Sequence, residues 1–340
     1  MKTADFPKLL GNFLSIYLPS QRNFSKNTIS SYCDTFKLLL KYFNSAKGIS
    51  ADKIQLKQMN RELFLDFISW LEIDRNCSIS TTNQRLACIR SFFRFVQMEH
   101  PETMLECQKI LGMPFRRKYS PSICYLNADD LKLILEQPNY SLRTGRRDLT
   151  LLSLLYDTGA RVQEIADLKV RSIRLDAPAQ VTLIGKGNKA RVIPLMEATV
   201  SLLRGYLEEH HLNIPKCFEY PLFSNQRHEP LTRAGICYVL NKYANQARII
   251  QPLLPEKITP HIFRHSKAMH LLEAGINIVY IRDILGHVDI STTEIYAKAN
   301  MEMKRAALEK VSHISSGNVP FWANDADLVT WLTDFGKSLN

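Results

Sequence analysis

The sequence has 340 residues, 45% of them hydrophobic and 23% charged, which is ordinary for a globular protein and enough for two domains. Its formal net charge of +11 favours a polyanionic partner, nucleic acid above all, unless the excess is simply a solvated basic surface. The seven cysteines are scattered, which argues against a disulfide scaffold and a zinc site. No apolar run reaches the roughly 18 residues that a membrane span needs. With no signal peptide, the sequence favours the cytoplasm.

Residues 1–112 have the pattern of a helical domain. One helix is expected to start at Ser25, another carries an apolar stripe from Leu63 to Leu71, and a third is expected to open at Ser80. The third helix carries three arginines between its apolar positions: Arg85, Arg90 and Arg94. These arginines can contact phosphates, or they can form an ordinary polar helix face.

Residues 113–124 predict a linker, because they contain two prolines and a basic triplet but no hydrophobic period. The triplet is Arg116, Arg117 and Lys118, which can lie along a DNA backbone. A second domain is expected from residue 125, with a helix start at Asn127.

The second domain contains one β signal. Residues 181–184 and 190–195 predict short strands, and the Gly-Lys-Gly-Asn-Lys sequence between them has the chemistry of a hairpin turn. The rest of the domain has helical patterns, without a Rossmann or P-loop glycine motif. The predicted fold class is therefore mainly α, with two domains and a small β-hairpin or sheet in the second.

Thr259 and Pro260 predict a helix start that puts His261 and Arg264 on one face of its first turns. Backbone N–H groups at such a terminus favour an anion. His265 stands four residues after His261, a spacing that can bind a metal. However, no glutamate lies between them as in HExxH, and the arginine would repel a cation, so no metal is expected.

The sequence Ser-Thr-Thr-Glu at 291–294 is a capping box, which puts Tyr296 in the first turns of a helix and His287 in the loop before it. A tyrosine is usually a core or interface ring, and its pKa of about 10 makes it a weak nucleophile without cationic neighbours or a base. Arg161 precedes Glu164 by three residues, either as a simple ion pair or as an arginine oriented towards phosphate. Lys186, at the hairpin tip, is either a solvated lysine or a general acid.

In this order the motifs resemble those of the tyrosine recombinase, or phage integrase, family, most of all its Xer-type and simple integrase members. The strings TGARVQEI, IGKGNKARVIPL, TPHIFRHS and LGHVDISTTEIY match the family pattern, and NTISSY and STTNQRLACIRSFF resemble its core-binding domain. The matching catalytic positions are Arg161, Lys186, His261, Arg264, His287 and Tyr296. The resemblance implies a SAM-like core-binding domain at 1–112, a catalytic domain at 125–312 and a tail helix at 313–340.

The resemblance also implies a mechanism, in which the tyrosine attacks the scissile phosphate to leave a 3′-phosphotyrosyl bond and a free 5′-hydroxyl. Arg161 and Arg264 would clamp the non-bridging oxygens, and His287 would add a hydrogen bond. His261 would assist proton transfer from the tyrosine, and Lys186, or Lys189 beside it, would protonate the leaving oxygen. A partner strand would then reverse the step without metal, ATP or another cofactor.

The implied assembly is a homo-tetramer on paired inverted sites in double-stranded DNA. The free protein would be a monomer or a dimer. A second recombinase or an accessory protein could also take part. The tail would dock on a neighbouring protomer, with cis packing as the alternative. The length of chain after Tyr296 favours an integrase of a mobile element over a compact Xer protein, and the direct start with core-binding helices indicates no arm-binding domain.

Two other functions stay open at the level of sequence. One is a catalytically silent DNA-binding or architectural protein, against which all six catalytic positions hold functional residue types. The other is a type IB topoisomerase, which shares the phosphotyrosine chemistry but does not need an exchange tail. The sequence therefore predicts a site-specific DNA recombinase that acts on the nucleoid in the cytoplasm.

Overall fold

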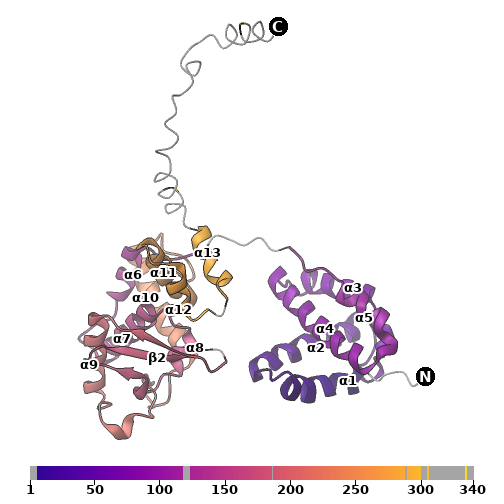
Figure 1. The fold of residues 1–340 in the computed structure, drawn as a ribbon, viewed down its shortest axis with the longest axis horizontal. Coiled ribbons are helices and arrows are strands. Elements are labelled where there is room, and N and C mark those ends of the chain that lie inside the picture. Colours follow the sequence, from indigo (N-terminus) through magenta and orange to yellow (C-terminus); the bar gives the residue numbers. More distant parts are fainter. Residues whose placement is uncertain are drawn as a thin grey trace. The chain divides into compact units, whose positions relative to one another are not determined.

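In this computed structural model, the described residues are 6–117, 123–185, 187–287, 289–299, 305 and 334. The chain divides into two compact units, Met1–Pro121 (unit 1) and Ser122–Asn340 (unit 2), each with its own buried core (Figure 1). Both units are mainly helical and unit 2 adds a small sheet, so the predicted fold class is confirmed. The predicted tail helix, 313–340, lies outside the described residues except for Asp334. Within the described part of the chain, none of the helices is long and apolar enough to cross a bilayer.

Unit 1 is built from helices joined by short helical turns. They are α1 (Phe6–Asn12), the π-helical η1 (Phe13–Gln21), α2 (Lys26–Lys47), α3 (Arg61–Ile73), α4 (Ile79–Glu99) and α5 (Met104–Leu111). Its core is rich in phenylalanine, whose rings meet edge to face: the centroid of Phe92 lies 5.3 Å from those of Phe13 and Phe36. The aromatic stripe of α4 thus packs against η1 and α2, and its polar face remains for other contacts.

The helix starts in unit 1 follow side-chain caps. Ser25 caps α2 as predicted, because its Oγ accepts a hydrogen bond from the backbone N–H of Thr28 at 3.3 Å. The predicted opening of α4 at Ser80 is wrong by two residues. Ser78 is the cap and accepts from the N–H of Thr81 at 3.3 Å, so Ser80 already lies inside the helix.

Unit 2 places helices around a three-stranded antiparallel sheet in the order β1-β2-β3. Its longer elements are α6 (Ala128–Leu135), α7 (Arg143–Thr158), α8 (Val162–Ala166), β1 (Ile173–Arg174), β2 (Gln180–Ile184), β3 (Ala190–Pro194), α9 (Glu197–Glu209), α10 (Arg233–Ile250), α11 (Pro260–Glu273), α12 (Ile278–Leu285) and α13 (Ser291–Ala299). The predicted hairpin is confirmed, with Ile184 opposite Ala190. β1 was not predicted, because two residues are too short to show an alternating pattern.

A small apolar cluster joins α11, α12 and α13, which lie side by side in Figure 1. Its buried members are Ala268, Met269, Leu272, Ile281, Leu285 and Tyr296. Thr259 caps α11 by accepting from the N–H of Ile262, as predicted, so the His261 and Arg264 motif stands in its first turns. This packing brings the helix that carries Tyr296 against the helix that carries the two histidines and Arg264.

Candidate active site

The structure brings five of the six predicted catalytic residues to one region of unit 2. Arg161 stands at the start of α8, His261 and Arg264 in the first turns of α11, His287 between α12 and α13, and Tyr296 on α13. The sixth, Lys186, lies outside the described residues. The residue before it, Gly185, donates a backbone hydrogen bond to the carbonyl of Lys189 at 2.9 Å.

Arg161 is oriented by the carboxylate of Glu164. Its backbone N–H and Nη1 donate to the two carboxylate oxygens at 2.8 and 3.0 Å, and Nη2 donates to the carbonyl of Gly286 at 3.3 Å. A second arginine shares that carboxylate, because Nη1 and Nη2 of Arg191 donate to it at 2.9 and 2.7 Å while Nε donates to the carbonyl of Ile284 at 2.9 Å. Arg191 therefore ties β3 and the end of α12 to the carboxylate that holds Arg161.

Glu164 stays ionised despite its burial. Burial alone would raise the pKa of this carboxyl group, but the hydrogen bonds from Arg191 and Arg161 outweigh that effect and hold the pKa below its ordinary value. The sequence suggested two roles for the pair, a simple ion pair or an oriented arginine. The paired geometry and the 35% exposure of the Arg161 side chain agree with an arginine that presents its remaining donors outward.

Arg264 is almost completely buried and is held by backbone carbonyls instead of by a carboxylate. Nη1 donates to the carbonyl of Gly159 at 2.7 Å, and Nη2 donates to that of Leu285 at 2.6 Å. Burial and the charge of nearby Arg161 lower the pKa of Arg264 to about 10, which still leaves it protonated at neutral pH. A buried cation whose hydrogen-bond partners in the described part of the chain are neutral carbonyls is suited to bind an anion.

The same positive field acts on His287. Its Nδ1 lies 2.8 Å from Oγ1 of the buried Thr293, and its ring stacks on that of Tyr296 with centroids 6.5 Å apart. Burial, together with the charges of Arg264 and Arg161, lowers the pKa of His287 to about 4. The imidazole is therefore neutral near pH 7, and the site has an excess of positive charge that a phosphodiester would neutralise.

Tyr296 is only 1% exposed, and its hydroxyl forms a hydrogen bond inside the site. The partner is Nδ1 of His265, 2.9 Å from the phenol oxygen, with ring centroids 5.6 Å apart. Burial raises the pKa of Tyr296, although the charge of Arg264 opposes this. The sequence indicated His265 only as one half of a possible metal pair, and it did not predict this contact with Tyr296.

His261, the histidine predicted to assist the tyrosine, lies on the exposed side of α11. Its ring centroid is 6.5 Å from that of His265, and burial together with Arg264 and Arg161 lowers its pKa. Among the described residues, no group of three His, Cys, Asp or Glu side chains lies together as a metal site would require. The structure thus places His261 beside the arginines rather than on the phenol.

The arginines predicted to contact DNA from α4 differ in their surroundings. Arg85 has an internal role, because its Nη1 donates to the carbonyl of Ser31 at 3.3 Å and to Oγ1 of Thr35 at 3.0 Å, which ties α4 to α2. Arg90 stacks over the ring of Phe115 at 4.8 Å. Arg94, in contrast, is exposed. Of the three, Arg94 is the one whose charge is presented to solvent.

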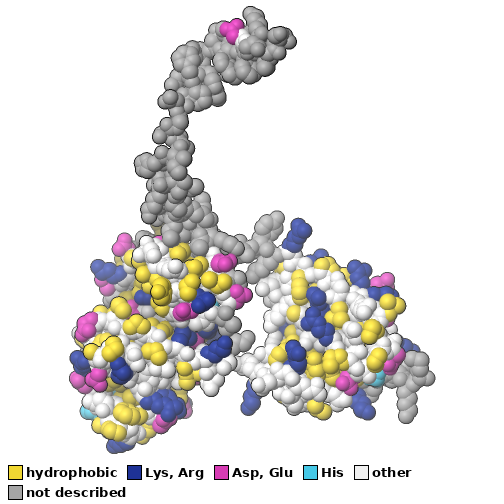
Figure 2. Space-filling model, viewed as in Figure 1, with side chains coloured by type: hydrophobic (Ala, Val, Ile, Leu, Met, Phe, Trp, Pro, Cys, Tyr) yellow, Lys and Arg dark blue, Asp and Glu magenta, His cyan; other side chains and the backbone are white. Residues whose placement is uncertain are grey.

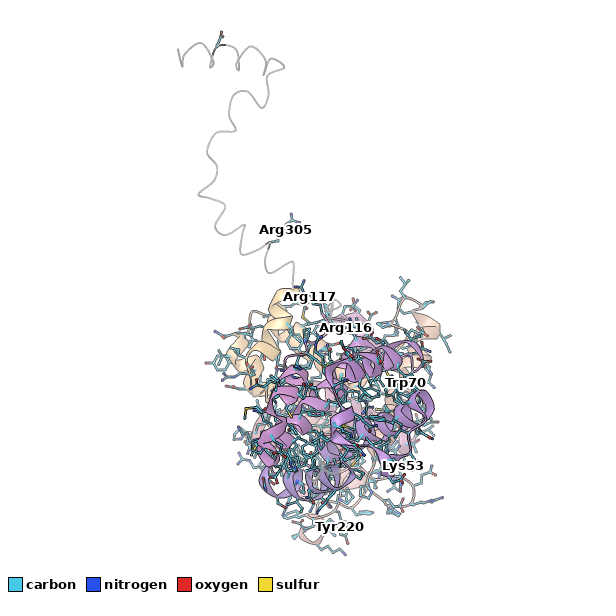
Figure 3. The ribbon with its side chains drawn as sticks, turned by 90° about the vertical axis from the view of Figure 1, so that its right-hand side faces the viewer. Lys53, Trp70, Arg116, Arg117, Tyr220 and Arg305 are labelled. Atoms are coloured by element: carbon cyan, nitrogen blue, oxygen red, sulfur yellow. The ribbon has the colours of Figure 1, made fainter. Side chains whose placement is uncertain are left out.

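The basic triplet after α5 is described in part. Arg116 pairs with Glu72 at 3.4 Å, and Arg117 is exposed; Figure 3 labels both at the upper edge of unit 1. Lys118 lies outside the described residues. Lys and Arg side chains also gather on the face of unit 1 drawn in Figure 2. The exposed arginines Arg94 and Arg117 are therefore the better candidates for phosphate contacts in unit 1.

Two family models match the chain, one in each unit. A family model described as "Phage integrase family" matches residues 125–303, and one described as "Phage integrase, N-terminal SAM-like domain" matches residues 12–100. A putative integrase/recombinase of Sinorhizobium fredii is 34% identical over 325 residues, covering 95% of this chain and 97% of the relative. Tyrosine recombinase XerD of Listeria monocytogenes is 33% identical over 294 residues, covering 85% of this chain and 93% of the relative.

Two solved structures share the fold. The XerH site-specific recombinase bound to palindromic difH substrate has a TM-score of 0.67 at 23% identity, covering 84% of this chain and 80% of that one. The Tn1549 transposon integrase in complex with transposon right end DNA has a TM-score of 0.68 at 16% identity, covering 88% and 98%.

The chain belongs to the phage integrase family, the tyrosine recombinases. It is an enzyme of site-specific DNA recombination, which breaks and rejoins DNA strands. The relatives are recombinases and integrases, so neither the silent DNA-binding protein nor the topoisomerase considered from the sequence is favoured.

Proposed function

We propose that Tyr296 is the nucleophile of this recombinase, and that it attacks the scissile phosphate to form a 3′-phosphotyrosyl bond. The observation that carries the proposal is the surplus of positive charge around the buried phenol. Arg161 and Arg191 share the single carboxylate of Glu164. Arg264 is bound by backbone carbonyls, which carry no full negative charge. A scissile phosphate entering this site supplies the missing negative charge, and the arginines stabilise the further charge that develops in the transition state.

In this proposal, Arg161 and Arg264 bind the non-bridging oxygens, and His287 donates a hydrogen bond to one of them. Each guanidinium has five N–H donors and spends few of them on its protein contacts. His261 lies at the exposed side, where it can contact the phosphate edge. Lys186 protonates the leaving 5′ oxygen, with Lys189 as the alternative, because the hairpin between β2 and β3 is the element that carries both.

The buried state of Tyr296 belongs to the resting protein. At 1% exposure the phenol cannot reach a DNA phosphate directly, so DNA binding moves the loop before α13, whose His287 ring stacks on Tyr296, while α13 stays packed on α11. This loop contains Gly286 and His287, whose contacts to Arg161 and Thr293 would adjust at the same time. A nucleophile that is shielded until the substrate arrives avoids unproductive cleavage.

We also propose the assembly that the family resemblance implies. The working form is a homo-tetramer on two DNA sites with inverted half-sites, the free form is a monomer or dimer, and a second recombinase or accessory protein can take part. The tail, 313–340, docks on a neighbouring protomer. The relative named a putative integrase/recombinase supports a role in the movement of a mobile element. The net charge of +11 supports a location on the nucleoid in the cytoplasm.

The test is covalent capture on nicked duplexes that contain the DNA flanking the gene. Wild-type protein should give an SDS-resistant adduct, and Tyr296→Phe should bind the same DNA with unchanged affinity but give none, because the nucleophilic oxygen is absent. Tyr280→Phe is the matched control, since Tyr280 is exposed on the adjacent helix α12 and should leave the adduct unchanged. Adduct formation by Tyr296→Phe would rule out Tyr296 as the nucleophile.

A further inference from the structure

The hydrogen bond between His265 and Tyr296 joins two helices that are distant in sequence. Nδ1 of His265, on α11, lies 2.9 Å from the phenol oxygen on α13. A heavy-atom distance of this size is within the range over which a general base takes a proton. Because α11 and α13 share a buried apolar cluster, the contact rests on a packed helix pair and not on a loose surface encounter.

His265 and His261 differ in their relation to the phenol. The two are four residues apart on α11, with ring centroids 6.5 Å apart, and His261 lies towards the exposed side of the helix. Among the described residues, the side chain that is hydrogen-bonded to the phenol oxygen is His265. The residue that the family pattern marks for proton transfer is therefore not the one that contacts the reacting oxygen here.

The charged and titratable groups that face His265 keep its ring neutral. His261 and Arg264 face it from its own helix, Tyr296 from α13, and His287 from the loop between α12 and α13. Burial first, and then His261 and Arg264, lower the pKa of His265, so one ring nitrogen has a free lone pair near pH 7. The same burial raises the pKa of the phenol, which makes a proton acceptor necessary.

We propose that His265 is a catalytic residue that accepts the proton of Tyr296 during strand cleavage, the role that the family resemblance assigns to His261. The inference rests on the proposed function. As the bond between the phenol oxygen and phosphorus forms, the phenol proton moves to Nδ1 of His265, whose other nitrogen, Nε2, carries the second proton. The bond from phosphorus to the 5′ oxygen breaks, and that oxygen takes a proton from the hairpin lysine. Rejoining returns the proton from the imidazolium to the tyrosine.

The first experiment compares His265→Ala with His265→Asn in single-turnover adduct formation on the nicked duplex. An asparagine can accept a hydrogen bond from the phenol but cannot take its proton. We expect both variants to form the adduct about 10²–10⁴-fold more slowly while DNA affinity stays at the wild-type value, since loss of a general base has effects of this size. A near-wild-type rate for His265→Asn would overturn the proposal, because His265 would then only position the phenol.

The second experiment replaces Tyr296 by a difluorotyrosine, whose phenol has a lower pKa and depends less on a base. This replacement should recover much of the lost rate in His265→Ala and little of it in His261→Ala. Recovery in His261→Ala alone would assign the proton transfer to His261 and overturn the proposal. These outcomes are distinct from a failure of the proposed function, in which the protein with Tyr296 and both histidines intact would form no adduct at all.

Discussion

At the scale of the residue, the site gathers arginines whose charges, together with burial, lower the pKa values of the groups beside them. Arg264 has a pKa lowered to about 10, and His287 has one lowered to about 4, because both are buried and both face Arg161. Residue types in the sequence predicted which groups would bind a phosphate. Their pKa values depend on burial and on neighbours from other helices, which a sequence pattern does not contain.

We expect the depressed pKa of His287 to make the folded state less stable in mild acid. In the unfolded chain this histidine titrates at its ordinary value of 6.5, and in the folded protein at about 4. Between these values the unfolded chain binds more protons, so the free energy of unfolding falls as the pH drops from about 6.5 to about 4. His287→Asn should remove part of this dependence.

The measurement is urea unfolding of wild type and His287→Asn at pH 7.5, 6 and 5. Wild type should lose more of its unfolding free energy than the variant between the first and last pH. His261 and His265 also have lowered pKa values, so the variant retains some loss. Equal losses in the two proteins would mean that His287 is not desolvated in the folded state.

At the scale of the element, the turn after α12 contacts both Arg161 and Arg191. Gly286 has a φ of +64°, its carbonyl accepts from Arg161, and a Cβ added there would lie 3.0 Å from both Cδ and Nη1 of Arg191. Glycine is favoured here for two reasons: the backbone has a positive φ, and the side chain of Arg191 lies close to where a Cβ would be. The turn therefore couples the end of α12 to the arginine network, and the histidine that follows it to Tyr296.

Gly286→Ala should lower both stability and cleavage, because the methyl group strains the backbone and displaces Arg191. Gly275→Ala is the matched control: Gly275 also has a positive φ, of +80°, but nothing lies within 4 Å of an added Cβ. Both variants should lose about 1 kcal/mol of unfolding free energy from the backbone alone. The adduct rate should fall clearly more in Gly286→Ala, and equal rates would show that the turn does not position the site.

At the scale of the whole molecule, the basic residues behind the net charge of +11 differ in whether DNA can contact them. Arg85 spends its guanidinium on Ser31 and Thr35, and Arg116 is paired with Glu72. Arg94 and Arg117 are exposed, so their guanidinium groups are accessible to a phosphate. The net charge correctly predicted a nucleic-acid partner. Which arginines can contact it depends on their burial and on whether they are already paired within the protein.

We expect Arg94→Gln to weaken DNA binding and to lower the slope of log affinity against log salt concentration by about one, as for one lost phosphate contact. Lys109→Gln is the charge-matched control, because Lys109 is paired with Glu106 at 2.7 Å on α5. Binding isotherms at several salt concentrations give both slopes. Identical slopes for the two variants would mean that Arg94 adds only to the overall charge.

How much of the molecule was predictable depends on the range of the interaction. The hairpin of β2 and β3 and the start of α11 were predictable, because a Gly-Lys-Gly-Asn-Lys turn and a Thr-Pro cap act over a few residues. β1 was not, because its two residues have no period of their own. The sequence also did not predict the role of Arg191. Its position in β3 has the pattern of an ordinary strand residue, and its carboxylate partner, Glu164, lies on α8.

By itself, the sequence determined the family, the helical character of both units and the residue types that stand at the catalytic positions, because ordered motifs and local periodicity are properties of the chain. Only the tertiary structure decided which groups touch. It placed His265 rather than His261 on the phenol of Tyr296, joined Arg161 to Arg191 through Glu164, and turned Arg85 inward. These contacts join residues from separate elements, and they exist only once α11, α12, α13 and β3 have packed together.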